Sequence, residues 1–317
     1  MLAETTSFTL DGIAARMIRV EVDVHRGLPN FQIVGLPDAA VREARERVRA
    51  ATVNCGFDFP LQRITASLAP ADLRKAGPAM DLALATALLG AAGDLKIEPL
   101  AGWSLVGELA LDGSVRPVRG ALAMAEEARE QGRRGVIVPT ANGPEAALAE
   151  GITVLTIDNF GELASLQRGE IPGRLAIPAV PGGSDEMPDL ADLRGQGHLR
   201  AAVEISAAGG HGLLMIGPPG AGKSLAARRL PSVLPPLAGE EVLEVARIAS
   251  ACGIGDGRIS STRPFRAPHH TVSAAGLVGG GSPPRPGEIT LAHRGLLFLD
   301  ELCELNRPAL EALRDPL

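Results

Sequence analysis

The chain has 317 residues, of which 45% are apolar, 21% are charged and 3% are aromatic, and its net charge is −6. This length suits two domains rather than one core, and the scarcity of aromatic residues favours helices packed on a mainly parallel sheet. The negative charge excludes a globally basic surface for nucleic acid, although a local basic loop stays compatible with it.

The first residues of the chain are not expected to act as an export signal. Residues 1–6 lack the basic and apolar regions of a signal peptide. The longest apolar runs, such as Leu82–Leu89, are too short to span a bilayer. The three cysteines are widely spaced and show no metal-ligand spacing, which favours a reducing compartment (Cys55, Cys252 and Cys303). These features predict a soluble cytoplasmic protein with no membrane contact.

Residues 1–168 are predicted to form a mixed α/β domain. Alternating apolar residues indicate strands, and apolar residues at helical spacing indicate helices, the first of them capped by Asp38. The predicted strands are Phe8–Leu10, Met17–Val22, Phe31–Val34, Ile64–Leu68, Ser104–Leu111 and Gly135–Val138, and the predicted helices are Ala39–Cys55, Asp81–Ala92, Gly120–Gln131 and Gly143–Glu150.

A linker and a second domain follow. Residues 169–189 are rich in Pro and Gly and keep no apolar period, so they are predicted to form the linker. Residues 190–317 then make up the second domain. Its predicted strand His211–Ile216 runs directly into a Gly-rich loop, and the helical stretch Leu225–Leu230 comes after that loop.

The Gly-rich loop matches the phosphate-binding pattern GxxxxGK[ST] in full. Glycines let backbone N–H groups turn toward phosphates, and the helix N-terminus adds partial positive charge. Lys223 would reach the β- and γ-phosphates of ATP, and the Ser224 hydroxyl would ligate Mg²⁺. The strand–loop–helix context makes a chance Gly-rich turn the weaker interpretation. The predicted ATP-binding residues are Gly217, Pro218, Pro219, Gly220, Ala221, Gly222, Lys223 and Ser224.

Such a site needs a second, acidic element. An apolar run over 295–299 predicts a strand, and Asp300 and Glu301 follow it directly. Asp300 would hold the Mg²⁺ ion, directly or through water, and Glu301 would polarise the attacking water as general base. By itself, an apolar run that ends in two acids is usually a strand meeting its loop. Together with the phosphate loop, it predicts ATP hydrolysis.

Residues 263–287, between these two motifs, are too rich in Gly and Pro for a regular element and predict a long surface insertion. Its arginines could contact nucleic-acid phosphates. The alternative, which the sequence favours equally, is that this insertion contacts another subunit or has an ordering role. His269 and His270 are adjacent but lack a third ligand, which argues against a metal site.

The chain resembles the ComM/YifB group of magnesium-chelatase-like AAA+ ATPases over nearly its whole length. The matching segments are 27–40, 43–50 and 68–82 in the first domain and 265–271 and 287–302 in the second. The resemblance implies a Lon-protease-like domain followed by a P-loop NTPase (AAA+) module with three layers, with ATP and Mg²⁺ as cofactors.

The same resemblance implies a function. The group forms homo-hexameric ring motors that remodel DNA by branch migration during natural transformation and recombination. The related magnesium-chelatase subunit instead drives metal insertion into a porphyrin. A chelatase-type or chaperone-type ATPase that acts on protein or a metallocofactor is therefore the alternative hypothesis.

A Lon-like first domain also raises peptide hydrolysis by a Ser-Lys dyad as a possible activity. In Lon-type proteases the nucleophile follows a Gly-Pro pair, whereas in this chain Gly77-Pro78 is followed by Ala79. The position of the lysine falls at about Leu122, and the sequence has no lysine between Lys96 and Lys223. Neither Ala nor Leu can attack a carbonyl or carry a proton, so the first domain is expected to be a non-catalytic scaffold.

The resemblance implies that a complete AAA+ module continues with a sensor strand, an arginine finger and a helical lid. The expectation is therefore a module truncated after Glu301, with little ATP turnover by the 317 residues alone. The expected missing strand would lie between the P-loop strand and the Asp300 strand, so both would keep unpaired backbone groups. An inactive fragment with only an interaction role is the third hypothesis.

Overall fold

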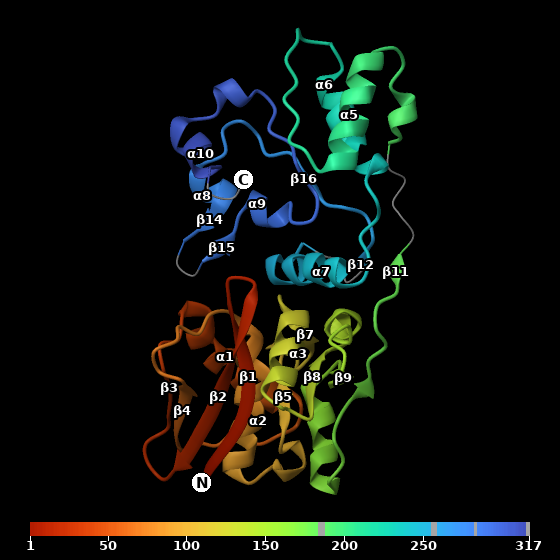
Figure 1. The fold of residues 1–317 in the computed structure, drawn as a ribbon. Helices are drawn as coiled ribbons and strands as arrows, with labels where there is room; N and C mark the ends of the chain where they lie inside the picture. The colour runs from red at the N-terminus through yellow and green to blue at the C-terminus, as the bar shows by residue number, and fades with distance from the viewer. Residues whose placement is uncertain (183–187, 255–258, 282–283, 315–317) are drawn as a thin grey trace. The chain divides into compact units, whose positions relative to one another are not determined.

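The computed structural model describes residues 1–182, 188–254, 259–281 and 284–314 (Figure 1). Its contacts divide the chain into two units. The first comprises Met1–Ala179 together with Ala249–Arg258, and the second comprises Val180–Ile248 and Ile259–Leu317. Both units combine helices with strands, which confirms the predicted α/β fold class of a Lon-protease-like domain followed by a P-loop NTPase domain.

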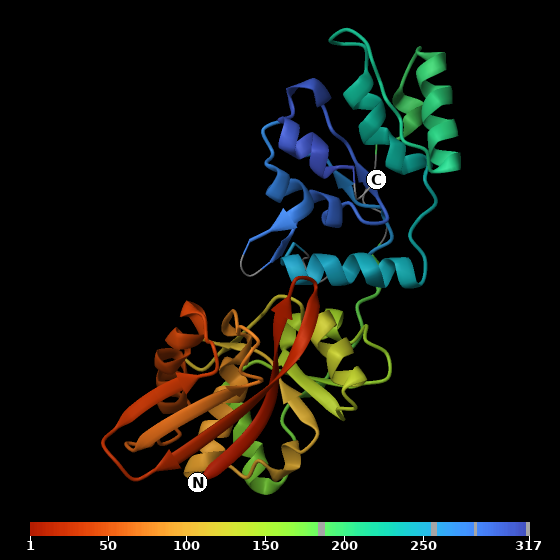
Figure 2. The ribbon, with the colours of Figure 1, turned by 60° about the vertical axis from the view of Figure 1, so that its left-hand side comes forward.

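The first sheet of the first unit consists of β1 (Leu2–Asp11), β2 (Ala14–His25), β3 (Asn30–Val34) and β4 (Arg63–Ala69) in the order β1-β2-β4-β3. The pairs β1–β2 and β2–β4 are antiparallel, whereas β3 lies parallel to β4. Figure 2 shows these long red and orange strands side by side. In β2, Ile18, Val20 and Val22 are fully buried at alternate positions, as expected for a sheet with one face on the core.

Two helices cover the core of this sheet. Helix α1 (Ala39–Asn54) begins after Asp38, whose Oδ1 accepts a hydrogen bond of 2.8 Å from the backbone N–H of Val41, and this confirms the predicted cap. Helix α2 (Asp81–Ala92) packs against β1 and β2 and is buried along almost its whole length. A helix that is apolar all round is stable only when it is enclosed in this way.

The second sheet of the first unit has the order β10-β9-β8-β5. Its parallel strands are β5 (Trp103–Leu105), β8 (Gly135–Pro139) and β9 (Thr153–Ile157), and β10 (Arg174–Leu175) pairs antiparallel with β9. The other elements are the hairpin β6 (Glu108–Leu109) and β7 (Val115–Arg116), the helices α3 (Ala121–Glu130) and α4 (Gly143–Ala146), and the 3₁₀ helices Pro78–Met80, Glu98–Leu100, Thr140–Asn142 and Phe160–Arg168.

Two element predictions in this unit were too long. The predicted strand Ser104–Leu111 is divided between β5 and β6, because Gly107 turns away from the sheet. Its N–H donates to Ala79 O at 2.9 Å, and its carbonyl accepts from Leu82 N at 3.2 Å. The predicted helix Gly143–Glu150 ends as α4 at Ala146, where tighter i→i+3 bonds replace the helical ladder.

The second unit contains many short elements. Its strands are β11 (Pro181–Gly182), β12 (Ile259–Ser260), β13 (Phe265–Arg266), β14 (Gly279–Gly280), β15 (Arg285–Pro286) and β16 (Leu296–Leu297). Its helices are α5 (Gly197–Gly209), α6 (Lys223–Arg229), α7 (Glu240–Cys252, of which Ala249 onward belongs to the first unit), α8 (Ala274–Val278), α9 (Glu288–Leu291) and α10 (Arg307–Ala312), with 3₁₀ helices at Leu190–Asp192, Leu230–Val233 and Leu302–Glu304.

The predicted strand His211–Ile216 was wrong as a β-strand. Leu213 and Met215 pack against a small core, whereas Leu214 is 70% and Ile216 89% exposed, so the side chains do alternate. A strand also requires a backbone ladder, however, and no described residue provides one for this segment. The alternation of buried and exposed side chains agrees with the prediction, but alternation alone does not provide a neighbouring strand to pair with.

The predicted insertion 263–287 and linker 169–189 contain more structure than their composition suggested. Helix α8 and the hairpin β14–β15 lie within 263–287. Strand β13 also lies there and pairs in parallel with β16, because backbone pairing needs no apolar side chains. Residues 282–283 lie outside the described part. In the linker, β10 completes the second sheet of the first unit, and residues 183–187 lie outside the described part.

Candidate functional site

The phosphate-binding pattern forms a turn that only glycine adopts easily. Gly220 has φ 79° and Gly222 has φ 81°, both in the left-handed region. Gly222 is also the N-cap of α6, which begins at Lys223. Pro218 and Pro219 are exposed on the loop. The glycine pattern is therefore used at two positions where a side chain would strain the backbone.

Lys223 lies against the loop that it was predicted to serve. Its Nζ donates hydrogen bonds to Gly217 O at 2.8 Å and to Pro218 O at 2.9 Å. Both acceptors belong to the loop itself, so the ammonium is held beside the glycines. A compact cation beside a Gly-rich backbone turn is the arrangement that phosphate oxygens require.

Ser224 and Asp300 are brought together by the fold. Ser224 Oγ donates a hydrogen bond of 2.9 Å to Asp300 Oδ2, across 76 positions of sequence. Mg²⁺ takes oxygen ligands in an octahedron at about 2.0–2.1 Å, and two adjacent ligands then lie about 2.9 Å apart. The two oxygens therefore fit the role of neighbouring Mg²⁺ ligands that the sequence assigned to them.

The shared core of the second unit explains this meeting. The core consists of Leu190, Leu193, Val203, Ala226 and Leu230, and Leu213, Met215 and Leu296 pack against it. Ala226 belongs to α6 and Leu296 to β16, so both the loop and the acidic strand end are anchored on one cluster. In Figure 1, α5 and α6 lie side by side.

Glu301 stands next to Asp300 but points to a partner that sequence reasoning missed. Its backbone N–H donates to Asp300 Oδ1 at 3.0 Å, and its φ of 51° is unusual for a residue other than glycine. Glu301 Oε2 lies 3.0 Å from His270 Nδ1. The two residues are 31 positions apart, and the parallel pairing of β13 with β16 brings their segments close, so no local pattern could reveal the contact.

Two of the three arginines in the stretch 263–287 form contacts within the second unit. Arg266 forms a bidentate pair with Glu288, at 2.7 and 2.9 Å. Arg263 donates to Pro235 O at 2.6 Å and Arg294 O at 2.7 Å and pairs with Glu241 at 3.1 Å. These contacts favour the ordering role for this stretch, because both guanidinium groups hold its backbone in place.

Within the described residues, no three His, Cys, Asp or Glu side chains form a group that could hold a metal ion. Nor does any described helix have both the length and the apolar character that crossing a membrane requires.

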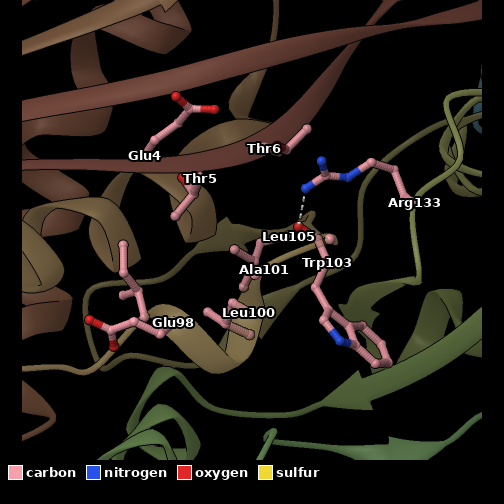
Figure 3. A pocket seen from close by; sticks show the side chains of 11 residues that line it. Glu4, Thr5, Thr6, Glu98, Leu100, Ala101, Trp103, Leu105 and Arg133 are labelled. Atoms are coloured by element: carbon pink, nitrogen blue, oxygen red, sulfur yellow. Dashed lines mark hydrogen bonds between the residues drawn. The ribbon is translucent and has the colours of Figure 1, made fainter.

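The positions of a protease dyad in the first unit are occupied by buried apolar residues. Ala79 is 6% exposed and Leu122 is fully buried. A pocket of about 300 Å³ in this unit is lined by other residues, among them Glu4, Trp103 and Arg133. Figure 3 shows Arg133 Nη2 donating to Trp103 O, at 2.9 Å. Because neither dyad position lines this pocket, it offers no support for peptide hydrolysis.

Lys75 is the second lysine with a clear structural role. It is fully buried, and its Nζ donates to the carbonyl oxygen of Pro70. Burial lowers the pKa of the Lys75 ammonium, and Asp72 opposes that effect. The side chain thus closes the turn between β4 and the 3₁₀ helix Pro78–Met80.

The chain matches two protein-family descriptions and several known relatives. The family described as magnesium chelatase, subunit ChlI, matches residues 189–317, and the family described as subunit ChlI of Mg-chelatase matches residues 20–142. The chain is 45% identical to YifB of Escherichia coli (strain K12) over 96% of its own length, and 40% identical to competence protein ComM of Haemophilus influenzae over 96%. The chain belongs to the ComM/YifB family of magnesium-chelatase-like proteins.

A mycobacterial relative also matches the chain over its whole length. The chain is 47% identical to the uncharacterized protein Rv2897c of Mycobacterium tuberculosis over its whole length. It covers 63% of that protein, 60% of YifB and 61% of ComM, so it spans about three fifths of the length of these relatives. Both halves of the phosphate site, Gly217–Ser224 and Asp300, fall within the 189–317 family match.

Proposed function

We propose that the second unit binds ATP with Mg²⁺ and that the protein hydrolyses ATP. The observation that carries this proposal is the 2.9 Å hydrogen bond between Ser224 and Asp300. It joins a Gly-rich phosphate loop to an acidic strand end, which are the two elements that P-loop ATPases combine. Membership of the ComM/YifB family supports the same activity.

Each residue then has a role. The backbone of Gly217–Gly222 and the Lys223 ammonium would bind the phosphates, and Ser224 and Asp300 would hold the Mg²⁺ ion. When bound, this ion neutralises charge on the phosphate oxygens. Glu301 accepts a proton from the attacking water as general base. The oxygen set is suited to Mg²⁺ because it contains only hard ligands.

A direct experiment is ATP binding followed by single-turnover hydrolysis. Wild-type protein is expected to bind ATP more tightly in the presence of Mg²⁺ and to release phosphate. Lys223→Ala is expected to bind ATP about 10- to 100-fold more weakly, whereas Glu301→Gln is expected to keep binding and lose hydrolysis. Equal binding and hydrolysis by all three proteins would exclude this site as the ATPase centre.

For the biological role, we propose a cytoplasmic homo-hexameric motor that remodels DNA. The competence protein ComM, at 40% identity, supports this role by its name. The family name magnesium chelatase, subunit ChlI, favours the alternative, an ATPase that acts on a protein or metallocofactor. Branched DNA added to the ATPase assay separates them, because only a DNA motor is expected to be stimulated. An interaction role without hydrolysis would show no ATPase under either condition.

A further inference from the structure

His270 and Glu301 meet because their segments leave one edge of a parallel strand pair. In that pair, Phe265 of β13 lies opposite Leu296 of β16. Segments that follow parallel strands emerge on the same side. His270 Nδ1 accordingly lies 3.0 Å from Glu301 Oε2, although His270 belongs to the stretch 263–287 and Glu301 to the acidic motif.

The Glu301 carboxylate needs such a partner. Its side chain is 62% exposed. The bond from its backbone N–H to Asp300 fixes the main chain, but it leaves the rotatable bonds of the side chain unrestrained. A general base acts only when its oxygen faces the reacting water, and a misplacement of about 1 Å can cost about 100-fold in rate. Without a second contact, the exposed carboxylate would sample many unproductive orientations.

His270, in contrast, sits on a segment that is held. The His269 ring lies 4.0 Å from the His270 ring, centroid to centroid. His269 Nδ1 is 3.0 Å from Thr271 Oγ1. The preceding strand is anchored by the bidentate contact of Arg266 with Glu288. The imidazole is therefore presented to Glu301 by a supported loop.

We propose that His270 is a positioning residue for Glu301. With its proton on Nδ1, 3.0 Å from Oε2, the ring restrains the carboxylate through this contact, while Oε1 is the oxygen that accepts the proton of water. This inference rests on the proposed ATPase function and adds that the stretch 263–287 controls the orientation of the base.

The test compares three histidine variants in the protein as its gene encodes it. His270→Ala is expected to lower kcat about 10- to 100-fold while KM for ATP changes by less than about twofold. His270→Asn is expected to restore most of kcat, because its Nδ2 can occupy the place of the ring Nδ1. His293→Ala is the matched control: His293 also lies 3.0 Å from a glutamate, Glu244, and this variant is expected to keep wild-type kcat.

Two further comparisons make the outcome decisive. In a Glu301→Gln background, His270→Ala is expected to cause no additional loss, whereas a general structural role would still lower the rate. If His270→Ala does not fold, His270→Asn and His270→Gln replace it, and Asn is expected to be the more active. Wild-type kcat for His270→Ala together with an inactive Glu301→Gln would overturn this inference alone. A wild-type protein without ATPase activity would overturn the proposed function and this inference with it.

Discussion

Ser224 of α6 and Asp300, three residues after β16, are joined by a hydrogen bond of 2.9 Å between Oγ and Oδ2. The bond is exposed, so its own contribution to stability is small. It is maintained because Ala226 and Leu296, close to the two residues in sequence, pack at one core. The geometry of the phosphate site therefore depends on apolar packing beneath it.

Replacement of Ser224 by Ala is predicted to remove most of the Mg²⁺ dependence of ATP binding. The change deletes one of the two oxygens that fit adjacent Mg²⁺ positions. Fluorescent ATP titrations with Mg²⁺ or with a chelator measure the effect. Ser232→Ala is the control, because Ser232 Oγ donates to Arg229 O at 2.7 Å within the same unit. An unchanged ratio of the two affinities in Ser224→Ala would contradict the assignment.

Glu301→Gln is predicted to separate binding from chemistry. The amide cannot accept the proton of water, so the hydrolysis rate is expected to fall about 100-fold or more. ATP affinity should stay within about twofold, since Glu301 is not assigned to the phosphates or the metal. Single-turnover phosphate release and equilibrium binding measure the two quantities. A variant that hydrolyses ATP at the wild-type rate would remove Glu301 from the mechanism.

Asp81→Ala is predicted to destabilise the first unit by about 3–5 kcal/mol. Asp81 is 1% exposed and pairs with Arg47 Nε at 2.6 Å, so the change leaves a half-buried guanidinium without this partner. Urea unfolding gives the free energy. Glu43→Ala is a matched control on the same Arg47. Because Glu43 is 74% exposed and 4.0 Å away, the expected loss is below about 1 kcal/mol. Equal losses in the two variants would contradict the structure.

A pH dependence is predicted for the second unit from Glu244. Hydrogen bonds from Arg294 and then His293 lower the pKa of Glu244 from 4.5 to about 2. A lowered acid pKa stabilises the folded state above pH 4.5, and this contribution is lost as the pH falls toward 2. Thermal unfolding of wild type and Glu244→Gln between pH 6 and 2 measures it. The difference between the two proteins should shrink on acidification, and a constant difference would oppose the prediction.

Glycine, lysine and serine at fixed spacing have few other uses, and Gly220 and Gly222 adopt the left-handed turn that suits such a loop, while phosphate binding stays a prediction. Sequence reasoning predicted α1 and its cap, since Asp38 lies directly before a helical pattern. It could not predict that His211–Ile216 lacks a ladder, because pairing depends on a neighbouring backbone rather than on the segment itself. The His270–Glu301 contact was missed for the same reason: it depends on which strands are adjacent.

The central claim is that Gly217–Ser224 binds ATP, and calorimetric titration of the protein with Mg·ATP tests it most directly. Lys223→Ala removes charge-assisted bonds to phosphate and is predicted to weaken binding about 10- to 100-fold. Lys96→Ala, at an exposed position of the first unit, should bind like wild type. Wild-type affinity in Lys223→Ala would contradict the account.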